Sequence, residues 1–491
     1  MDKENKFWKG VLAGALVTAF AGLVVVGLSA GIFLFGNGII KKAQKPKGPG
    51  YELEQQASNG GQVSNQASAE AESEEKKEEL DYQQIVYKMK MMQSLIEDKF
   101  LFEEDYQKIE DTIYLGMMVG LEDPYSTYYT PEELSELMEE TEGEYSGIGA
   151  LVSQNRLTGL ISIMKVYDNT PSAEAGMEAG DQLYKVDGEE VYGMDLDVLV
   201  NSHIKGKEGS KVEIEVYRPS IEDYVTLEIT RRKIEVPTVE YEMLDNEIGY
   251  LAVSQFDLIT EKQFSEAIES MKNQGMNKLI IDLRNNPGGV MQTALAMLDY
   301  VLEDDISTYK DPYGNKENQG KTLLLYTADK EEKGDSFSCS DGKSLNIPIV
   351  LLINESSASA SEIFAGALKD YGAAEIVGTT SFGKGIVQSV FPLADGSAVK
   401  LTTEHYYTPS GKDIHGKGIE PDVTVEPNEE LIKRLVVEHE KDNQLQAAVD
   451  VLEEGADAVK ERLVEESQAE EESQAAEESW EAETEGSEAE E

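Results

Sequence analysis

From about Glu247 onward the sequence alternates between strand and helix patterns, and this alternation constrains the fold more than any other feature of the chain. Residues 248–253 and 279–283 are short apolar runs of strand length, and residues 260–274 between them place apolar side chains along one face of a helix. A further apolar run follows at residues 349–353. Such alternation is typical of α/β layering, in which helices cover a sheet.

The apolar run at residues 279–283 leads into a polar, glycine-rich turn, Asp282-Leu-Arg-Asn-Asn-Pro-Gly-Gly289. Ligands of α/β sheets collect at the carboxyl ends of strands. Glycines also allow backbone N–H groups to approach a developing oxyanion closely. The turn is therefore a candidate part of an active site. The alternative is that Asp282, Arg284 and Asn285 only knit the turn together.

Two later segments contain the residue types of a hydrolytic site. Three serines in the sequence Ser357-Ala-Ser-Ala-Ser-Glu362 precede a predicted helix at residues 363–369, and Lys384 lies between two glycines ahead of an apolar run. A serine hydroxyl needs a base beside it, and with four histidines in the chain no Ser-His-Asp triad is evident. A buried lysine can serve as that base because burial lowers its pKa. The pattern allows a serine–lysine centre without choosing among the three serines.

Structural alternatives exist for each of these residues. Ser359 and Glu362 have the spacing of a capping box, so Ser359 is equally suited to begin a helix. Lys384 and Gln388 would share one face of a strand over residues 384–390, where the Gln388 amide could orient the lysine amine. The alternative is that both are ordinary surface residues of an edge strand.

Residues 144–233 change to short strands in which apolar and polar residues largely alternate. The glycine-flanked segment Ser146-Gly-Ile-Gly-Ala150 precedes one strand and could direct backbone N–H groups at the terminal carboxylate of a peptide. The alternative for this loop alone is a turn that binds nothing. Together with the segment from Pro171 to Gly188, the region resembles a PDZ domain. The resemblance implies that Ile148, Gly149 and Ala150 bind peptide.

Composition excludes several classes of partner and site. The formal net charge is −53, so the phosphates of nucleic acid would be repelled. Cys339 is the only cysteine, which rules out an internal disulfide and a multi-cysteine zinc site. We expect no metal and no cofactor.

The two ends of the chain differ from its middle. Residues 10–40 contain no charged residue and are long enough to cross a bilayer. We interpret them as an uncleaved transmembrane anchor after a cytoplasmic segment 1–9, followed by a disordered tether at 41–80. Residues 456–491 are mostly Glu, Ala and Ser and are predicted to be a disordered acidic tail.

Motifs in a fixed order also connect the chain with a known family. It resembles the C-terminal processing (tail-specific) serine peptidases over roughly residues 82–450. The segments that carry this resemblance, besides the PDZ region, are 120–133, 282–289, 357–362, 382–385 with Gln388, 406–411 and 416–422.

This resemblance implies an α/β fold: a crotonase-like protease core with an inserted PDZ domain. The expected domains are a helical N-terminal segment 81–143, the PDZ domain 144–233, the protease core 234–427 and a C-terminal helix 428–455. In the helical segment, Thr130 is predicted as the N-cap of a helix that starts at Pro131. An apolar stripe rich in methionine is expected to pack in a core.

The resemblance also assigns the site. It makes Ser359 the nucleophile, Lys384 its base and Gln388 the third member of the catalytic group. The backbone N–H groups of Ala360 and of Gly288 would form the oxyanion hole. One position departs from the family pattern, because Lys205 stands where an arginine is common, and lysine lacks the bidentate fork of arginine.

The function expected is that of a serine endopeptidase tethered to the cell membrane by a single span, with its catalytic domain outside the cytoplasm. It would recognise the free C-termini of protein or peptide substrates through the PDZ domain and hydrolyse peptide bonds through an acyl-enzyme. Self-association into a homodimer is left open. The alternative is a catalytically inactive PDZ scaffold on the same fold.

Overall fold

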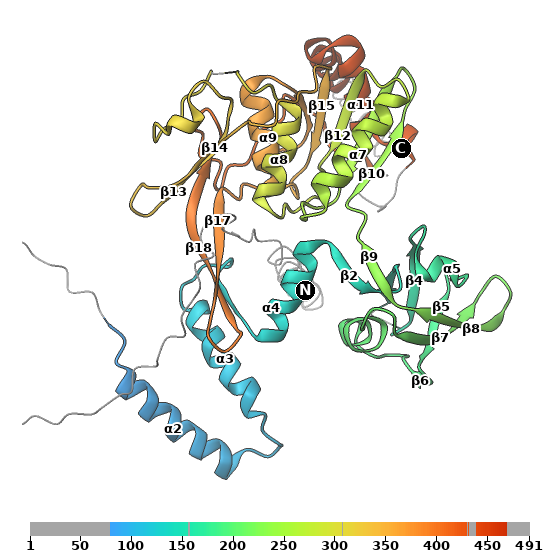
Figure 1. Cartoon of the computed structure of the whole chain (residues 1–491), viewed down its shortest axis with the longest axis vertical. Coiled ribbons are helices and arrows are strands. Elements are labelled where there is room, and N and C mark those ends of the chain that lie inside the picture. The colour runs from blue at the N-terminus through green and yellow to red at the C-terminus, as the bar shows by residue number, and fades with distance from the viewer. Residues whose placement is uncertain (1–78, 156–157, 307, 430, 432–437, 469–491) are drawn as a thin grey trace, which may run out of the picture. The chain divides into compact units, whose positions relative to one another are not determined.

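The computed structural model describes most of the chain from residue 79 to residue 468 (Figure 1). The residues within this range that it does not describe are 156–157, 307, 430 and 432–437. The predicted membrane span at 10–40 lies outside the described residues. None of the helices in the described part of the chain is both long enough and apolar enough to cross a membrane.

The chain divides into two compact units, and the smaller contributes the described residues up to Ile113. It contains α2 (Tyr82–Lys99), whose N-cap residue Asp81 accepts a hydrogen bond from Gln84 N, and the first part of α3 (Tyr106–Val119). Neither helix has a buried residue. The prediction that their apolar stripe packs in a core is wrong for the described residues, because these supply no layer that covers it.

The described part of the larger unit begins at Tyr114 and includes α4 (Pro131–Glu142). Thr130 Oγ1 accepts a hydrogen bond from Glu133 N at 3.2 Å, and the Glu133 carboxylate accepts one from Thr130 N at 2.9 Å. Both halves of a capping box are therefore present. The predicted N-cap and the predicted first residue of this helix are confirmed.

The PDZ region is entered and left through two neighbouring strands. Strand β2 (Glu144–Gly147) pairs antiparallel with β9 (Arg232–Glu235). Between them, a sheet has the order β3-β4-β5-β7-β8, with β6 paired to β5, around its own apolar core. The elements are β3 (Ala150–Gln154), β4 (Ile161–Val166), α5 (Pro171–Glu174), β5 (Gln182–Val186), β6 (Glu189–Glu190), α6 (Leu196–Val198), the π-helix Leu199–Ile204, β7 (Lys211–Arg218) and β8 (Asp223–Thr230).

The region predicted as the core, residues 234–427, contains a six-stranded sheet with the order β10-β11-β12-β15-β16-β19. All neighbours are parallel except the edge strand β10. Helices α7, α8 and α9 pack against one face, and α11 packs against the other (Figure 1). The elements are β10 (Val239–Met243), β11 (Ile248–Val253), α7 (Thr260–Asn273), β12 (Lys278–Asp282), α8 (Met291–Val301), β15 (Ile349–Ile353), α9 (Ala360–Tyr371), β16 (Glu375–Gly378), β19 (Val423–Thr424) and α11 (Asn443–Glu454).

A second sheet adjoins this core and pairs a strand from before the PDZ region with strands that follow it. Strand β1, which precedes the PDZ region, pairs antiparallel with β18, so the chain before the PDZ region is part of the core sheet system. The order is β1-β18-β13-β14, with β17 also paired to β18. The strands are β1 (Thr127–Tyr129), β13 (Leu323–Asp329), β14 (Ser336–Ser338), β17 (Ile386–Pro392) and β18 (Ala398–Tyr407); short 3₁₀ helices lie at Lys316–Asn318 and His439–Lys441.

The C-terminal part corrects one predicted boundary. Asp442 caps α11 by accepting a hydrogen bond from Leu445 N at 2.9 Å. A further helix follows at residues 456–468, where the sequence predicts the start of a disordered tail. That boundary is too early because Val459 is fully buried in the apolar cluster beneath α11.

Candidate active site

Ser359 lies at the sharp turn between strand β15 and helix α9, directly before the first helical residue, Ala360. The helix thus begins three residues earlier than predicted. The φ angle of Ser359 is 54°, a value that residues other than glycine seldom adopt. Backbone strain of this kind persists only where the surroundings hold it, and it concentrates at functional sites.

The carboxylate of Glu362 joins the serine segment to the lysine segment. Its Oε2 atom accepts hydrogen bonds from Ser359 N at 2.9 Å and from Lys384 N at 2.8 Å. Its Oε1 atom accepts from Gly383 N at 2.7 Å and from Ser381 Oγ at 2.6 Å. Burial raises the pKa of Glu362, and these donors oppose that rise. Glu362 therefore positions the loop that carries Lys384, a role that its spacing from Ser359 did not indicate.

Lys384 is 2 % exposed. Burial lowers the pKa of its amine to about 8, although the negative charges of Glu362 and Asp123 act in the opposite direction. Its Nζ atom lies 4.7 Å from the centre of the Tyr125 ring. Among the described residues, no hydrogen bond joins Lys384 Nζ to Ser359 Oγ. The two segments are thus assembled, and the amine has the proton affinity of a general base.

Gln388 is buried on β17, but not through simple alternation along a strand from residue 384. The strand begins at Ile386, and its register with β18 shifts between Val387 and Gln388. This irregularity places Gln388 opposite Thr402. The Nε2 atom of Gln388 lies 3.5 Å from Ile386 O and 3.5 Å from Thr402 Oγ1. The prediction of one regular strand face is wrong, because a bulge re-aims the side chain.

Gly288 packs directly against the serine turn. A Cβ atom at this position would lie 2.6 Å from Ala358 O, 2.9 Å from Ala360 N and 2.9 Å from Ser359 Cβ, so only glycine fits. The Gly288 N–H, however, donates a hydrogen bond to Asn286 Oδ1 at 2.9 Å. Among the described residues, none accepts a hydrogen bond from Ala360 N. The predicted oxyanion donors are adjacent, but one is already engaged by Asn286, which the sequence did not single out.

The other polar residues of the turn after β12 have a structural role. Arg284 donates to Asp282 Oδ2 at 2.6 Å and to Asp442 Oδ2 at 2.8 Å, which ties the strand end to the start of α11. It also donates to Gln444 Oε1 at 3.0 Å. The contacts of Asp282 and Arg284 agree with the structural alternative, in which these residues hold the turn together by hydrogen bonds.

The predicted peptide-binding loop of the PDZ region lies between β2 and β3, which begins at Ala150. The carbonyl oxygen of Ile148 accepts hydrogen bonds from the backbone and side chain of Ser172. The backbone of Gly149 faces the hydroxyl of Tyr145, and it partly opposes the effect of burial, which raises the pKa of that hydroxyl to about 12. One backbone group expected to hold a carboxylate therefore lies beside a phenol.

Lys205, the position that departs from the family pattern, lies outside this loop. Its Nζ atom donates to Glu139 Oε2 of α4 at 2.5 Å and lies 5.6 Å from the centre of the Tyr145 ring. Its charge is therefore directed at an acidic residue that precedes the PDZ region.

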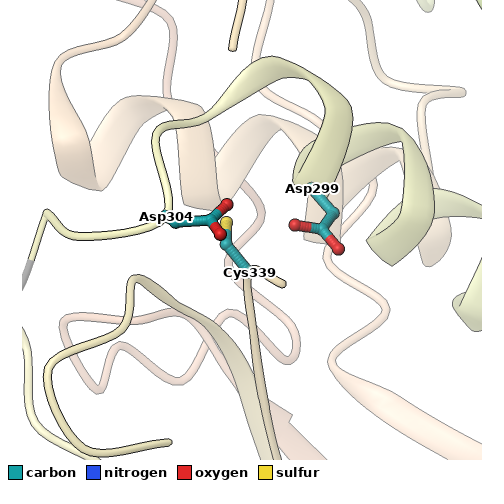
Figure 2. Close-up of side chains that lie close together, drawn as sticks. All are labelled: Asp299, Asp304 and Cys339. Carbon is teal, nitrogen blue, oxygen red and sulfur yellow. The ribbon is translucent and has the colours of Figure 1, made fainter. Parts of the chain in front are cut away.

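A cluster of possible metal ligands lies away from the serine turn. Figure 2 shows Asp299, Asp304 and Cys339 converging, with one ligand atom of each within 4.8 Å of the others. Burial raises the pKa of the Cys339 thiol well above its usual range, whereas metals bind the thiolate. Asp299 also accepts a hydrogen bond from Ser340 N at 2.7 Å. The contacts of these residues do not indicate a metal site.

Known proteins match this chain in sequence. The model of peptidase family S41 matches residues 247–425, and a PDZ domain model matches residues 146–230. A carboxyl-terminal-processing protease of Synechocystis sp. is 33 % identical over 357 residues, which are 72 % of this chain and 78 % of the relative. The chain belongs to the carboxyl-terminal processing proteases of peptidase family S41. It is therefore a serine peptidase with a PDZ domain.

Two further comparisons show how much of this S41 peptidase is similar to known proteins. The carboxy-terminal processing protease CtpA of Bacillus subtilis is 35 % identical over 331 residues, which cover 67 % of each chain. Among solved structures, a photosystem II D1 C-terminal processing protease is 28 % identical, with a TM-score of 0.39 and coverage of 69 % of this chain and 86 % of that one.

Proposed function

We propose that this S41 peptidase cleaves peptide bonds with Ser359 as nucleophile, Lys384 as general base and Gln388 as the group that orients the lysine amine. The observation that carries the proposal is the single Glu362 oxygen that accepts hydrogen bonds from both Ser359 N and Lys384 N. The lowered pKa of the buried Lys384 amine supports the same assignment.

In the first half of the reaction, neutral Lys384 accepts the proton of Ser359 Oγ while Oγ bonds to the scissile carbonyl carbon. The carbonyl oxygen becomes an oxyanion beside the Ala360 N–H, which lies at the start of a helix where the dipole favours negative charge. The tetrahedral intermediate then collapses. The C–N bond breaks, and the lysine ammonium gives its proton to the leaving amine.

In the second half, water attacks the acyl-enzyme ester. Lys384 takes a proton from that water, and a second tetrahedral intermediate forms. When the ester C–O bond breaks, the lysine returns the proton to Ser359 Oγ. The free serine and a new C-terminal carboxylate result. No metal or cofactor takes part in either half.

For substrate recognition, we propose that the PDZ loop at Ile148 and Gly149 binds the free C-terminus of a protein or peptide. Backbone N–H groups of such loops capture terminal carboxylates. Binding would require the Tyr145 hydroxyl to move away from the backbone of Gly149, which it faces. The substrate's C-terminus would thus compete with a side chain of the enzyme.

The experiment for the catalytic assignment compares the full-length protein with Ser359→Ala, Lys384→Met and Gln388→Ala on a labelled, unstructured protein such as casein. We expect Ser359→Ala and Lys384→Met to lose activity to a similar extent, by about three orders of magnitude or more, because the two residues act as one unit. An exposed, matched control is Lys330→Met. Turnover at the wild-type rate in Ser359→Ala would refute the assignment.

We further propose that residues 10–40 anchor the peptidase in the cell membrane with the catalytic domain outside the cytoplasm. The uncharged sequence of that stretch supports an anchor. The exposed apolar side chains of α2 and α3 support self-association into a homodimer. An inactive scaffold is the weaker alternative, because Ser359, Lys384 and Gln388 are all retained.

A further inference from the structure

The segment before strand β1 contacts the strand that faces Gln388, although the catalytic assignment gives this segment no role. Asp123 lies in a turn where its carboxylate accepts hydrogen bonds from Tyr125 N at 3.1 Å and from Ser126 Oγ at 2.6 Å. The Oδ2 atom of Asp123, which accepts from Ser126 Oγ, also accepts a hydrogen bond from Thr402 Oγ1 on β18 at 2.7 Å. Ser126 Oγ in turn accepts from Thr402 N at 3.1 Å. Two hydrogen bonds therefore fix Thr402 to this turn.

The chemistry of these groups sets the direction of each hydrogen bond. An ionised aspartate only accepts, so Thr402 uses its single hydroxyl proton toward Asp123. The lone pairs of Thr402 Oγ1 are then left to accept from the Gln388 amide, whose Nε2 lies 3.5 Å away. The second neighbour of Nε2 is a backbone carbonyl, Ile386 O, which also only accepts. Both contacts hold the nitrogen end of the amide, and they leave Oε1 as the end that can accept from the Lys384 amine.

We propose that Asp123 is a positioning residue of the catalytic centre, acting through the Thr402 hydroxyl on the orientation of the Gln388 amide and through its negative charge on Lys384. This inference deepens the proposed function and rests on it. Without the charge of Asp123, the Thr402 hydroxyl can rotate and donate elsewhere, and the amide loses one of the two acceptors that hold its nitrogen end.

Charged and titratable groups surround Lys384 on several elements. Glu362 lies on α9, and Asp123 and Tyr125 lie in the turn before β1. Lys400 lies on β18, where its Nζ donates to Tyr129 Oη at 2.7 Å; burial and the charge of Lys384 lower the pKa of Lys400 to about 8. Asp123 is one of two acids whose charge favours the ammonium form of Lys384. Its removal should therefore lower the pKa of the lysine amine.

The test uses the full-length protein and labelled casein, with Asp123→Asn as the main variant. We expect kcat to fall by about tenfold or more with KM nearly unchanged, because Asp123 does not touch substrate. We also expect the acid limb of the kcat/KM profile to move to lower pH by roughly half a unit, because less negative charge favours the neutral amine. A role in folding alone would lower the fraction of active enzyme, and with it the apparent kcat, but it would not move the acid limb.

Further variants separate the effect of the Thr402 hydroxyl on Gln388 from the effect of the Asp123 charge on Lys384. Thr402→Val removes the hydroxyl and should lower kcat without moving the acid limb, whereas Thr402→Ser should restore most of the activity. Glu122→Gln removes the exposed neighbouring carboxylate, and we expect wild-type kinetics. The loss in the double variant Asp123→Asn with Thr402→Val should be smaller than the two single losses combined, because both act on one amide.

Wild-type kcat and an unmoved acid limb in folded Asp123→Asn would overturn the proposal, as would full activity in Thr402→Val. If these variants are fully active while Ser359→Ala is inactive, only the role of Asp123 fails. If Ser359→Ala is also fully active, the catalytic assignment itself fails. If circular dichroism shows that Asp123→Asn is unfolded, the variant Thr402→Val decides whether the Thr402 hydroxyl acts on the Gln388 amide.

Discussion

At Lys384, burial and neighbouring charges act in opposite directions on proton affinity. Removal from water lowers the pKa of the amine, and Glu362 and Asp123 raise it; the balance is about 8. Because Glu362 is saturated with hydrogen-bond donors, its charge is spread over the serine and lysine loops rather than paired with the lysine alone. The amine is therefore able to lose its proton near neutral pH.

The first prediction concerns the pH dependence of catalysis. Below pH 8 the Lys384 amine is protonated and cannot accept the serine proton, so kcat/KM should fall about tenfold per pH unit as the pH drops further. Above pH 8 it should level off. Lys384→Arg should be inactive at every pH, because arginine keeps its proton.

This pH dependence is measured as kcat/KM on labelled casein between about pH 6 and about pH 9.5, the range that brackets such a base. Circular dichroism over the same range serves as the control for unfolding. A flat profile, or turnover by Lys384→Arg, would contradict a lysine base.

At the scale of elements, two loops carry the groups proposed for catalysis and for substrate recognition. The turn that starts α9 holds Ser359 against Gly288, and the loop between β2 and β3 holds Gly149 against Tyr145. The first loop is tied to its surroundings by the buried Glu362. The second lies beside the Tyr145 hydroxyl, which a substrate carboxylate displaces in the proposed mode of recognition.

The second prediction therefore concerns the substrate's C-terminus. If the loop at Ile148 and Gly149 binds a carboxylate, amidation of the C-terminus should weaken binding by roughly tenfold or more, because a charged acceptor is replaced by a neutral group. The measurement compares KM for a peptide pair that differs only in this group. Tyr145→Phe should strengthen binding of the free acid, since no hydroxyl then competes for Gly149.

Equal KM values for the free and amidated peptides would refute carboxylate recognition by this loop. Tyr224→Phe, at an exposed tyrosine elsewhere in the PDZ region, is a suitable control. It should leave the KM of both peptides unchanged.

At the scale of the whole molecule, the membrane assignment rests on the sequence of residues 10–40 and on the tether that follows. A flexible tether over residues 41–80 would have a root-mean-square reach on the order of 30–40 Å. That reach would let an anchored catalytic domain meet substrates near the membrane surface.

The third prediction is that protease shaving of intact cells digests or releases the catalytic domain, because the proposed topology places it outside the cytoplasmic membrane. A fragment that begins after residue 40 should appear in the medium. An antibody against the protease core detects it, and a cytoplasmic protein serves as the control for cell lysis. Complete protection of the core until the membrane is breached would place the domain in the cytoplasm and contradict the proposal.

Local patterns in the sequence were sufficient for β11, α7, β12 and β15 of the core and for the capping box at Thr130 and Glu133. Both depend on residues a few positions apart, whose periodicity and side-chain chemistry act within one element. The choice of Ser359 as nucleophile came from resemblance, because a capping serine and a nucleophile look alike in sequence.

The tertiary structure decided which distant residues meet. Glu362 reaches Lys384, Asp123 reaches Thr402, and Gly288 packs on Ser359 only because sheet order and strand register bring these segments together. The register shift in β17 that places Gln388 opposite Thr402 depends on its partner strand. Hydrogen bonds between residues far apart in sequence have no local pattern that could reveal them, so these contacts could not be predicted from the sequence.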